Sequence, residues 1–355
     1  MQSVYKAIGV MSGTSLDGLD LAYCEFRFEN TRWTYTVKFA ETLEYSDDWK
    51  LRLKNAVMLS GLELAFLNVD YGHFLGESIQ QFVEKHALHP DLIAVHGHTI
   101  FHQPDKRLTL QIGDGAAIAS YVKLPVVTQF RNTDVALGGQ GAPLVPIGDK
   151  LLFNSADFCL NLGGIANISF TENAATTAFD ICVCNMALNS LASQKQYAYD
   201  KDGQLAKSGQ LKSDLLSQFN QLDFFKQHPP KSLGFEWFEK RFLPILNASD
   251  ASIEDKLHTV CEHIAIQISN IVNTQNNCSE KTMIVTGGGA KNEFLMSRIK
   301  QHCSCQISDS HLLIIDFKEA LIFAFLGVLR MRGEANCLAE VTGAKHNAVG
   351  GCVYV

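Results

Sequence analysis

The chain lacks the sequence features of membrane, secreted and nucleic-acid-binding proteins. Its longest apolar run, residues 321–329, is far shorter than the roughly 18 residues that a membrane-spanning helix needs. The N-terminus carries no positively charged segment followed by an apolar stretch and a cleavage site. The formal net charge of −7 comes without an acidic or basic block, so no surface for nucleic acid is indicated. We therefore expect a cytoplasmic protein that binds neither membranes nor nucleic acids.

The ten cysteines do not form a pattern typical of disulfides or of a zinc site. A chain of 355 residues does not need disulfide bonds to be stable, and most of its cysteines lie in apolar runs. Both points favour buried, reduced thiols. Cys182 and Cys184 are separated by one residue, as are Cys303 and Cys305, and this is not the usual spacing of a zinc ligand pair. A metal site at these cysteines is not expected.

Apolar positions alternate between strand-like and helix-like spacing along the chain, which is typical of an α/β protein. The helix predicted over residues 253–274 is the clearest, because its apolar residues share one face and Ser252 with Asp255 indicates a capping box. The segment 197–244 is predicted to form loops and short helices. Further strands are expected over residues 6–11, 21–28, 33–39, 92–96, 108–112, 158–161, 166–170 and 283–286, and a helix over 72–87.

Three apolar strands run directly into turns of small residues. The turns are IGVMSGTSLDG from Ile8, LNLGGIAN from Leu160 and IVTGGGAKN from Ile284. Glycine permits positive φ and lets the backbone approach a phosphate, whose oxygens accept hydrogen bonds from successive amides. A single turn of this kind is more often a tight strand-to-helix connection, but three of them match a nucleotide held between two lobes. The sequence contains neither a P-loop nor a Rossmann fingerprint.

The residues of these turns resemble those of the anhydro-N-acetylmuramic acid kinase family. Residues 9–18 resemble the first phosphate loop of the family, residues 161–167 the second phosphate loop, and residues 287–292 the adenosine loop. The similarity extends through ordered motifs from residue 9 to about 351. The other motifs are HG at 96–97 with His102, TLQIGD at 109–114, residues 130–146, PPKS at 229–232, EA at 319–320 and VTGA at 341–344.

The resemblance implies the two-lobed, RNase H-like fold of actin-like ATPases such as hexokinase and Hsp70, with a nucleotide and sugar cleft between the lobes. We expect residues 1–135 and about 340–355 in the first lobe and residues 136–339 in the second, and the family also suggests a homodimer. The implied enzyme uses ATP and Mg²⁺ to open the 1,6-anhydro ring of 1,6-anhydro-N-acetylmuramic acid with water and to phosphorylate O6. The product, N-acetylmuramic acid 6-phosphate, belongs to the recycling of cell-wall peptidoglycan.

The resemblance also implies which residues bind the nucleotide and its metal ion. Asp17 and Asp20 are the nearest carboxylates for Mg²⁺, which they would bind through water because this ion gives up its hydration shell reluctantly. Asp20 can equally be a solvent-facing residue at a strand edge. The implied nucleotide-binding residues are Gly13, Thr14, Ser15, Leu16, Asp17, Gly18, Leu19, Asp20, Gly163, Gly164, Gly287, Gly288, Gly289 and Asn292.

Asp180 matches the catalytic aspartate of the family. The resemblance implies that it is the general base that deprotonates the water attacking C1 of the sugar. From the residues alone, an aspartate in a turn or at the N-cap of the helix expected from Asn185 fits equally well. The first amides of that helix, at Asn185 and Met186, are expected to be available to an anion.

Three further residues match family motifs and are implied to bind the sugar. Arg131 can pair its fork of donors with the lactyl carboxylate, or it can form a salt bridge to Asp134 or Asp114. Glu319 precedes an apolar helix, where a carboxylate is stabilising in any case. His96 is the third residue.

The neighbouring histidines resemble a metal cluster at first sight. His96 and His98 would face the same side of a strand, and His102 follows closely. The surrounding residues offer no fourth ligand, so a zinc site is not predicted.

Three segments depart from the family's pattern. Residues 181–184 read ICVC where Thr-Gly-Pro-Gly is usual, Gln129 replaces an aspartate, and Phe235 stands where an arginine is usual. The intact phosphate loops and Asp180 favour the family kinase. The missing arginine suggests a kinase for a different 1,6-anhydrosugar, and the altered 181–184 loop suggests a catalytically weak paralogue that binds a sugar or a nucleotide.

Overall fold

The structure is a computed structural model of the chain that describes residues 3–13, 16, 18–173, 175–308 and 311–355. The chain forms two compact units, of which the first comprises Met1–Leu152 and Phe317–Val355 and the second comprises Phe153–Asp316. Residues 136–152 and 317–339, which the sequence assigned to the second lobe, are therefore part of the first unit.

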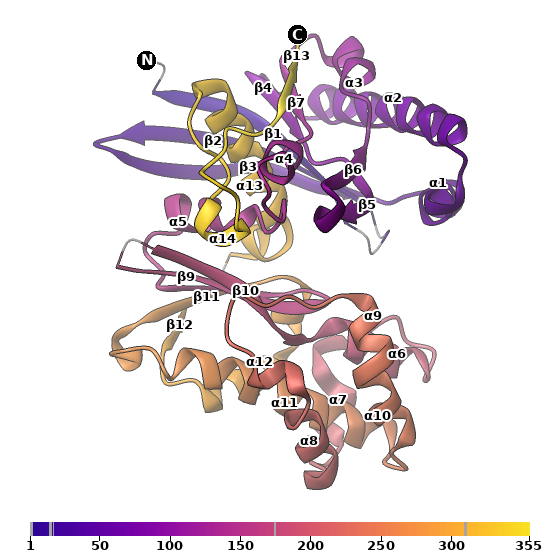
Figure 1. The fold of residues 1–355 in the computed structure, drawn as a ribbon, viewed down its shortest axis with the longest axis vertical. Helices are drawn as coiled ribbons and strands as arrows, with labels where there is room; N and C mark the ends of the chain where they lie inside the picture. Colours follow the sequence, from indigo (N-terminus) through magenta and orange to yellow (C-terminus); the bar gives the residue numbers. More distant parts are fainter. Residues whose placement is uncertain (1–2, 14–15, 17, 174, 309–310) are drawn as a thin grey trace. The chain divides into compact units, whose positions relative to one another are not determined.

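The first unit is built on a mixed six-stranded sheet in the order β13-β7-β4-β1-β2-β3 (Figure 1). The central strand β1 pairs antiparallel with β2 and parallel with β4. The C-terminal strand β13 forms one edge of the sheet and pairs antiparallel with β7. The strands expected over residues 6–11, 21–28 and 33–39 are therefore confirmed, and they pair as an antiparallel meander. The strands are β1 (Val4–Ser12), β2 (Leu19–Glu29), β3 (Arg32–Leu43), β4 (Leu92–Val95), β7 (Val126–Thr128) and β13 (Cys352–Tyr354), with β5 (His98–Gln103) and β6 (Leu108–Ile112) in a separate hairpin.

Helices α2 and α3 pack against each other in the first unit (Figure 1). Helix α2 begins well before the predicted residue 72, because Ser60 and Glu63 form a complete capping box at its start. Helix α13 lies against β1, where a Cβ on Gly9 would overlap the carbonyl oxygen of Ala320. The helices are α1 (Asp47–Asn55), α2 (Gly61–Lys85), α3 (Gly115–Val122), α4 (Asn132–Ala136), α5 (Val145–Leu152), α13 (Leu312–Arg332) and α14 (Ala339–Thr342).

The second unit has a five-stranded sheet in the order β10-β9-β8-β11-β12. Strands β8, β9 and β10 form an antiparallel meander, whereas β11 runs parallel to β8 and β12 parallel to β11. The strands are β8 (Phe158–Leu162), β9 (Ile165–Glu172), β10 (Ala175–Val183), β11 (Thr282–Thr286) and β12 (Gln306–Ser308). The helices are α6 (Asn185–Ser193), α7 (Gln204–Ser208), α8 (Ser213–Asn220), α9 (Phe235–Trp237), α10 (Leu243–Ala248), α11 (Ile253–Val272) and α12 (Glu293–His302).

Helix α11 packs one apolar face into the core of this unit, as its sequence spacing predicts. The side chain of Ser252 caps its start by accepting a hydrogen bond from the amide of Asp255 at 3.1 Å. The prediction of a complete capping box is wrong, because in the described residues the amide of Ser252 makes no hydrogen bond to the carboxylate of Asp255. The carboxylate of Asp255 instead binds the amide of Gln210 and the ammonium of Lys212.

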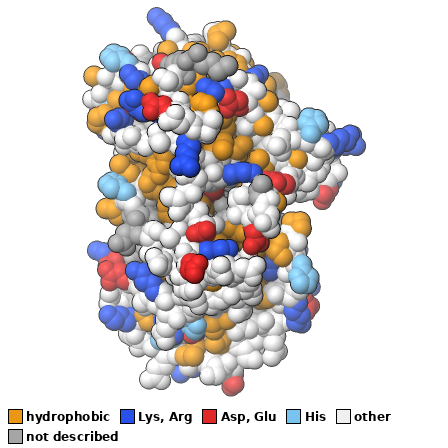
Figure 2. Space-filling model, turned by 90° about the vertical axis from the view of Figure 1, so that its left-hand side faces the viewer, with side chains coloured by type: hydrophobic (Ala, Val, Ile, Leu, Met, Phe, Trp, Pro, Cys, Tyr) orange, Lys and Arg blue, Asp and Glu red, His pale blue; other side chains and the backbone are white. Residues whose placement is uncertain are grey.

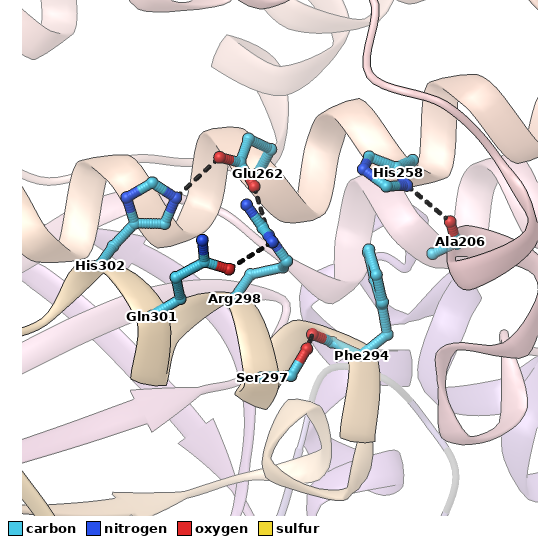
Figure 3. A network of polar contacts seen from close by, with 8 residues as sticks. All are labelled: Ala206, His258, Glu262, Phe294, Ser297, Arg298, Gln301 and His302. Atoms are coloured by element: carbon cyan, nitrogen blue, oxygen red, sulfur yellow. Dashed lines mark hydrogen bonds and ion pairs between the residues drawn. The ribbon is translucent and has the colours of Figure 1, made fainter.

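Helices α11 and α12 are joined by a polar network centred on Glu262 (Figure 3). This side chain is only 6% exposed, and its two oxygens bind Nε of Arg298 at 2.6 Å and Nε2 of His302 at 2.7 Å. Arg298 also donates to the amide oxygen of Gln301. Both oxygens of a nearly buried carboxylate are thereby hydrogen-bonded, as burial requires.

All ten cysteines are free thiols, and nine of them are buried. The expectation of reduced, buried thiols therefore holds in the structure. On the face drawn in Figure 2, side chains of both charge signs are interspersed with apolar ones. Among the helices of the described residues, none combines the length and apolar composition that a membrane crossing requires.

Candidate active site

The first glycine turn connects β1 to β2, with Ser12 and Leu19 forming the last residue pair of the hairpin. Within the turn, the amide of Leu16 lies 3.4 Å from the carbonyl oxygen of Gly13, and Leu16 itself has φ of 58°. Gly18 lies against β3, where a Cβ would come within 2.7 Å of the carbonyl oxygen of Leu43. Gly18 is therefore required by its close packing against β3, and binding of a phosphate by this turn stays a prediction.

Of the two carboxylates proposed for Mg²⁺, only Asp20 can be placed, because Asp17 lies outside the described residues. The nucleotide-binding candidates Thr14 and Ser15 also lie outside them. Asp20 lies on β2, and its Oδ1 accepts a hydrogen bond of 2.5 Å from the hydroxyl of Thr42. No group of three metal-ligating side chains occurs within the described residues. Binding of Mg²⁺ by Asp20 through water stays a prediction.

The second and third glycine turns meet at one edge of the sheet in the second unit. Gly163 and Gly164 join β8 to β9, while Gly287 follows β11, and the parallel strands β8 and β11 end at the same edge. A Cβ on Gly287 would lie 2.5 Å from Oδ1 of Asn161, and this glycine has φ of 82°. The loops that the sequence assigned to a phosphate and to adenosine are thus in direct contact.

Asn185 joins these two turns, although the sequence indicated it only as the start of a helix. Its Nδ2 donates to the carbonyl oxygen of Leu162 at 2.9 Å and lies 3.6 Å from the Cβ position of Gly288. An asparagine that follows the strand after a glycine hairpin was the only signal in the sequence, and it is too common to single this residue out.

The first backbone amides of α6 make hydrogen bonds that differ from the sequence prediction. The amides of Asn185 and Met186, expected to be available to an anion, donate to the carbonyl oxygens of Gly163 and Gly164 at 3.1 Å. That prediction is wrong, because the start of α6 folds back onto the glycine hairpin. Within the described part of the chain, no hydrogen bond uses the amides of Gly163 and Gly164. These two amides are the donors left for a phosphate.

The surroundings of Gly163 and Gly164 leave room for a side chain. A Cβ built on Gly163 would meet no atom closer than 3.4 Å, and one on Gly164 none closer than 3.7 Å. Their glycine character is therefore not imposed by packing within the chain, in contrast to Gly287. A phosphate can bind backbone N–H groups that have no other hydrogen-bond partner and no side chain over them.

Asn292 has a structural role at the end of the third turn. Its Oδ1 accepts a hydrogen bond of 2.9 Å from the amide of Leu295 and so caps α12. The side chain is 8% exposed and lies directly against Gly203. Contact between the loop over Gly287–Gly289 and residues near position 203 was not foreseen from the sequence.

Asp180 lies on β10, opposite Asn167 of β9 and beside a bulge in the strand pairing. Its amide donates to the carbonyl oxygen of Lys231, and its Oδ2 accepts from the amide of Leu233 at 2.8 Å. The reading of Asp180 as a helix cap is therefore wrong, since Cys184 occupies the N-cap of α6.

The environment of Asp180 suits a general base. Burial raises the pKa of Asp180, and the hydrogen bond from Leu233 opposes this shift. One carboxylate oxygen is thus anchored by Leu233, the residue that follows the PPKS motif, and among the described residues no hydrogen bond is made to Oδ1. A carboxylate held by one oxygen and basic at the other can accept a proton from water.

The unusual segment 181–184 continues the strand instead of forming a loop. Cys182 and Val183 pair with Ala166 and Ile165 of β9, and Ile181 lies at the bulge. The side chains of Ile181, Cys182, Val183 and Cys184 are all at most 1% exposed. The departure from the family therefore adds apolar side chains to the core, and burial raises the pKa of both thiols.

In the first unit, the guanidinium of Arg131 is oriented by two acceptors. Nε donates to Nε2 of His96 at 3.0 Å, and Nη1 donates to the carbonyl oxygen of Gly141 at 2.7 Å. Since Nε2 of His96 accepts, the hydrogen of this imidazole is on Nδ1, which lies 2.8 Å from the carbonyl oxygen of Gly97. Burial and the charge of Arg131 hold the pKa of His96 well below its usual range, so the ring is neutral.

His96 is 4% exposed, and both of its nitrogens are engaged. The structure therefore favours His96 as a residue that orients Arg131 over one that contacts the sugar directly. The carboxylate of Glu319 lies near enough to Arg131 to favour its charged form, against the effect of burial, which lowers the pKa of the guanidinium. Arg131 and Glu319 are thus neighbours, as the resemblance suggested for a sugar site.

Neither carboxylate proposed as a salt-bridge partner of Arg131 takes that role. Asp134 is 1% exposed and accepts hydrogen bonds from the amide of Gly141 and the hydroxyl of Thr342, both at 2.7 Å. Asp114 caps α3 through the amide of Ala117. Asp134 instead fixes the loop whose carbonyl at Gly141 binds Arg131, and the sequence alone did not reveal this function.

The three histidines do not converge on one point. His96 contacts Arg131, His98 contacts the hydroxyl of Ser12, and His102 contacts that of Thr109. Gly97, with φ of 78°, turns the chain between β4 and β5, so the expectation that His96 and His98 face one side of a strand is wrong.

Comparison with known proteins places the chain among kinases of one amino sugar. Over 98% of its length it is 37% identical to the anhydro-N-acetylmuramic acid kinase of Mannheimia succiniciproducens and 35% identical to that of Vibrio cholerae, covering 98% and 97% of those proteins. A solved structure of component A of the Acidaminococcus fermentans (R)-2-hydroxyglutaryl-CoA dehydratase overlaps 90% of the chain and 96% of its own length. Its TM-score of 0.45 and identity of 11% are too low to carry an argument.

The family model for anhydro-N-acetylmuramic acid kinase matches residues 5–355. The chain belongs to the anhydro-N-acetylmuramic acid kinase family. The resemblance recognised in the sequence is thereby confirmed, and the sheets and helices of the two units confirm the α/β fold class.

Proposed function

We propose that the chain is an ATP-dependent kinase that opens the 1,6-anhydro ring of 1,6-anhydro-N-acetylmuramic acid with water and phosphorylates O6. The product is N-acetylmuramic acid 6-phosphate, an intermediate in the recycling of peptidoglycan. The observation that carries the proposal is Asp180 on β10, whose Oδ2 is anchored by the amide of Leu233, in a chain that matches the family along its length.

The proposed mechanism assigns the proton transfer to Asp180. Its unanchored oxygen takes a proton from water as the water attacks C1 on the face opposite the leaving oxygen, O6. Partial burial raises the pKa of Asp180, which makes its carboxylate a stronger base than one in water. The C1–O6 bond breaks as the new C1–O bond forms, and O6 is then the acceptor for the γ-phosphoryl group that ATP supplies.

The phosphate oxygens are proposed to bind the bare amides of Gly163 and Gly164 in the second unit and the turn from Gly13 in the first. The adenosine is assigned to the loop Gly287 to Gly289. Mg²⁺ is expected to enter on the phosphates of ATP and to meet Asp20 through water. Arg131 is proposed to bind the lactyl carboxylate through the face of its guanidinium that does not contact His96 or Gly141.

The enzyme is expected to work in the cytoplasm, where ATP is available, and a homodimer is proposed from the family alone. The test of function is ATP turnover with Mg²⁺ against a small panel of sugars. Turnover should depend on a 1,6-anhydrosugar and be fastest with 1,6-anhydro-N-acetylmuramic acid. A comparable rate with glucose, or a faster rate with an anhydrosugar that lacks the lactyl acid, would contradict the assignment of the substrate.

A further inference from the structure

A chain of four buried polar side chains lies at the base of the first glycine turn. Oγ of Ser12 lies 2.9 Å from Nδ1 of His98 and accepts a hydrogen bond of 2.8 Å from the hydroxyl of Tyr45. The hydroxyl of Tyr45 lies 2.6 Å from that of Tyr71. All four side chains are at most 4% exposed. Ser12 lies in the segment that resembles the first phosphate loop, but none of the four residues is among those that the resemblance assigns to the nucleotide, the sugar or catalysis.

The hydrogen bonds of this chain have a defined direction at the tyrosines. The hydroxyl of Tyr45 has one hydrogen, which it donates to Ser12, so Tyr71 donates to Tyr45. Burial lowers the pKa of His98 to about 4, so its imidazole is neutral at pH 7. The neutral ring can accept the hydrogen of Ser12 at Nδ1 when its own hydrogen is on Nε2. Ser12 is thereby held from two sides.

These contacts tie the turn to three separate parts of the first unit. Ser12 is the last residue of β1 and directly precedes Gly13, Tyr45 follows β3, Tyr71 lies on α2, and His98 begins β5. Apolar side chains of similar shape would fill this space at little energetic cost, whereas a satisfied polar network fixes one arrangement. A fixed arrangement matters most where the backbone must present amides to a ligand.

We propose that Ser12, Tyr45 and His98 are positioning residues of the first glycine turn, which hold the backbone at Gly13 in the direction needed to bind the phosphates of a nucleoside triphosphate. The proposal rests on the proposed function only in taking this turn as a phosphate loop. It does not depend on the identity of the sugar. Nucleotide affinity measured without sugar therefore tests it separately from the reaction.

The direct test is the Kd of Mg-ATP measured by titration calorimetry with the full chain. Tyr45→Phe removes the donor to Ser12 and should weaken ATP binding by about tenfold. Tyr23→Phe is the matched control, because Tyr23 belongs to the same core and donates to the carbonyl oxygen of His89 at 3.4 Å. Its Kd should stay within about twofold of the parent. Equal effects of both variants, or no effect of Tyr45→Phe, would overturn the proposal.

A second pair of variants applies if Tyr45→Phe does not fold. His98→Leu removes the other partner of Ser12 and should weaken ATP binding to a similar extent, whereas His98→Gln keeps a hydrogen-bonding group and should restore most of the affinity. If both His98 variants bind ATP as the parent does, the network does not position the turn. A parent protein that binds ATP but turns over no anhydrosugar would contradict the proposed function and leave this proposal standing.

Discussion

Nε2 of His96 accepts a hydrogen bond of 3.0 Å from Nε of Arg131, and this contact fixes the protonation of one residue and the orientation of the other. The imidazole must be neutral, and burial together with the adjacent guanidinium keeps its pKa low. This contact holds the guanidinium of Arg131, and with it the N–H donors of that group, in one orientation. We therefore expect that His96, which the resemblance assigned to the sugar site, acts through Arg131.

Replacing His96 should weaken sugar binding with little effect on ATP. His96→Leu leaves Nε of Arg131 without an acceptor and should raise KM for the sugar by about tenfold or more. His96→Gln, whose amide oxygen can accept the hydrogen bond, should recover part of the loss. His73→Leu is the control, because His73 is an exposed histidine of the same unit that contacts the ring of Tyr121. Steady-state kinetics that show equal rises in KM for ATP and sugar would contradict this role.

The network at Glu262 should contribute stability that depends on pH. Burial alone raises the pKa of Glu262, but the hydrogen bonds from Arg298 and His302 outweigh it and lower the pKa. A lowered folded-state pKa contributes stability that is present above the unfolded-state pKa and lost as pH falls through the folded one. Glu262→Gln should therefore cost about 1.5 to 3 kcal/mol at pH 7 and less in acid.

Thermal unfolding at several pH values measures this difference. Glu239→Gln removes an exposed glutamate of the same unit and should change the unfolding temperature little at any pH. A loss of stability in Glu262→Gln that is as large in acid as at pH 7 would show that packing, and not the charge network, is responsible.

The sequence predicted the strands and glycine turns well, because alternation and small residues are local signals. The predictions from the sequence failed where a structural feature depends on contacts between residues that are far apart in the chain. Helix α5 belongs to the first unit, where Asp149 pairs with Lys318 at 2.7 Å and a Cβ on Gly148 would meet Ile322. No local pattern in residues 136–152 indicates that partner. The predicted boundary at residue 135 therefore fell before α5.

The site shows the same division between local and distant information. The three glycine turns and Asp180 could be recognised from short motifs. The contacts that define their chemistry could not, because Leu233 reaches Asp180 from 53 residues away and Gly141 reaches Arg131 through a loop fixed by Asp134. The segment 181–184 was described as a loop from the sequence, yet its β-branched residues extend β10.

The pH dependence of turnover should reflect the environment of Asp180. A general base must be deprotonated, and burial raises its pKa above the ordinary value of 3.8. Activity should therefore fall with decreasing pH at a pH above 3.8, as the raised pKa is crossed. The profile of kcat/KM for the sugar reports this group in the free enzyme. An acid limb at or below the ordinary value would show that Asp180 is not buried as described or is not the base.

Asp180→Asn should separate catalysis from nucleotide binding. The substitution preserves shape and the contact with Leu233 but removes the basic oxygen, so kcat should fall by about 10² to 10⁴. The Kd of ATP, measured by calorimetry, should stay within about twofold of the parent. Unchanged turnover in this variant would remove Asp180 from the mechanism, whatever the effect on affinity.

The position of ¹⁸O in the product tests the central claim most directly. The reaction is run in ¹⁸O-labelled water, and the product is analysed before its anomeric oxygen exchanges with solvent. Because water activated by Asp180 attacks carbon, one ¹⁸O atom should appear at C1 of N-acetylmuramic acid 6-phosphate and none in its phosphate. Label in the phosphate, with none at C1, would show that water attacks phosphorus and would contradict the account.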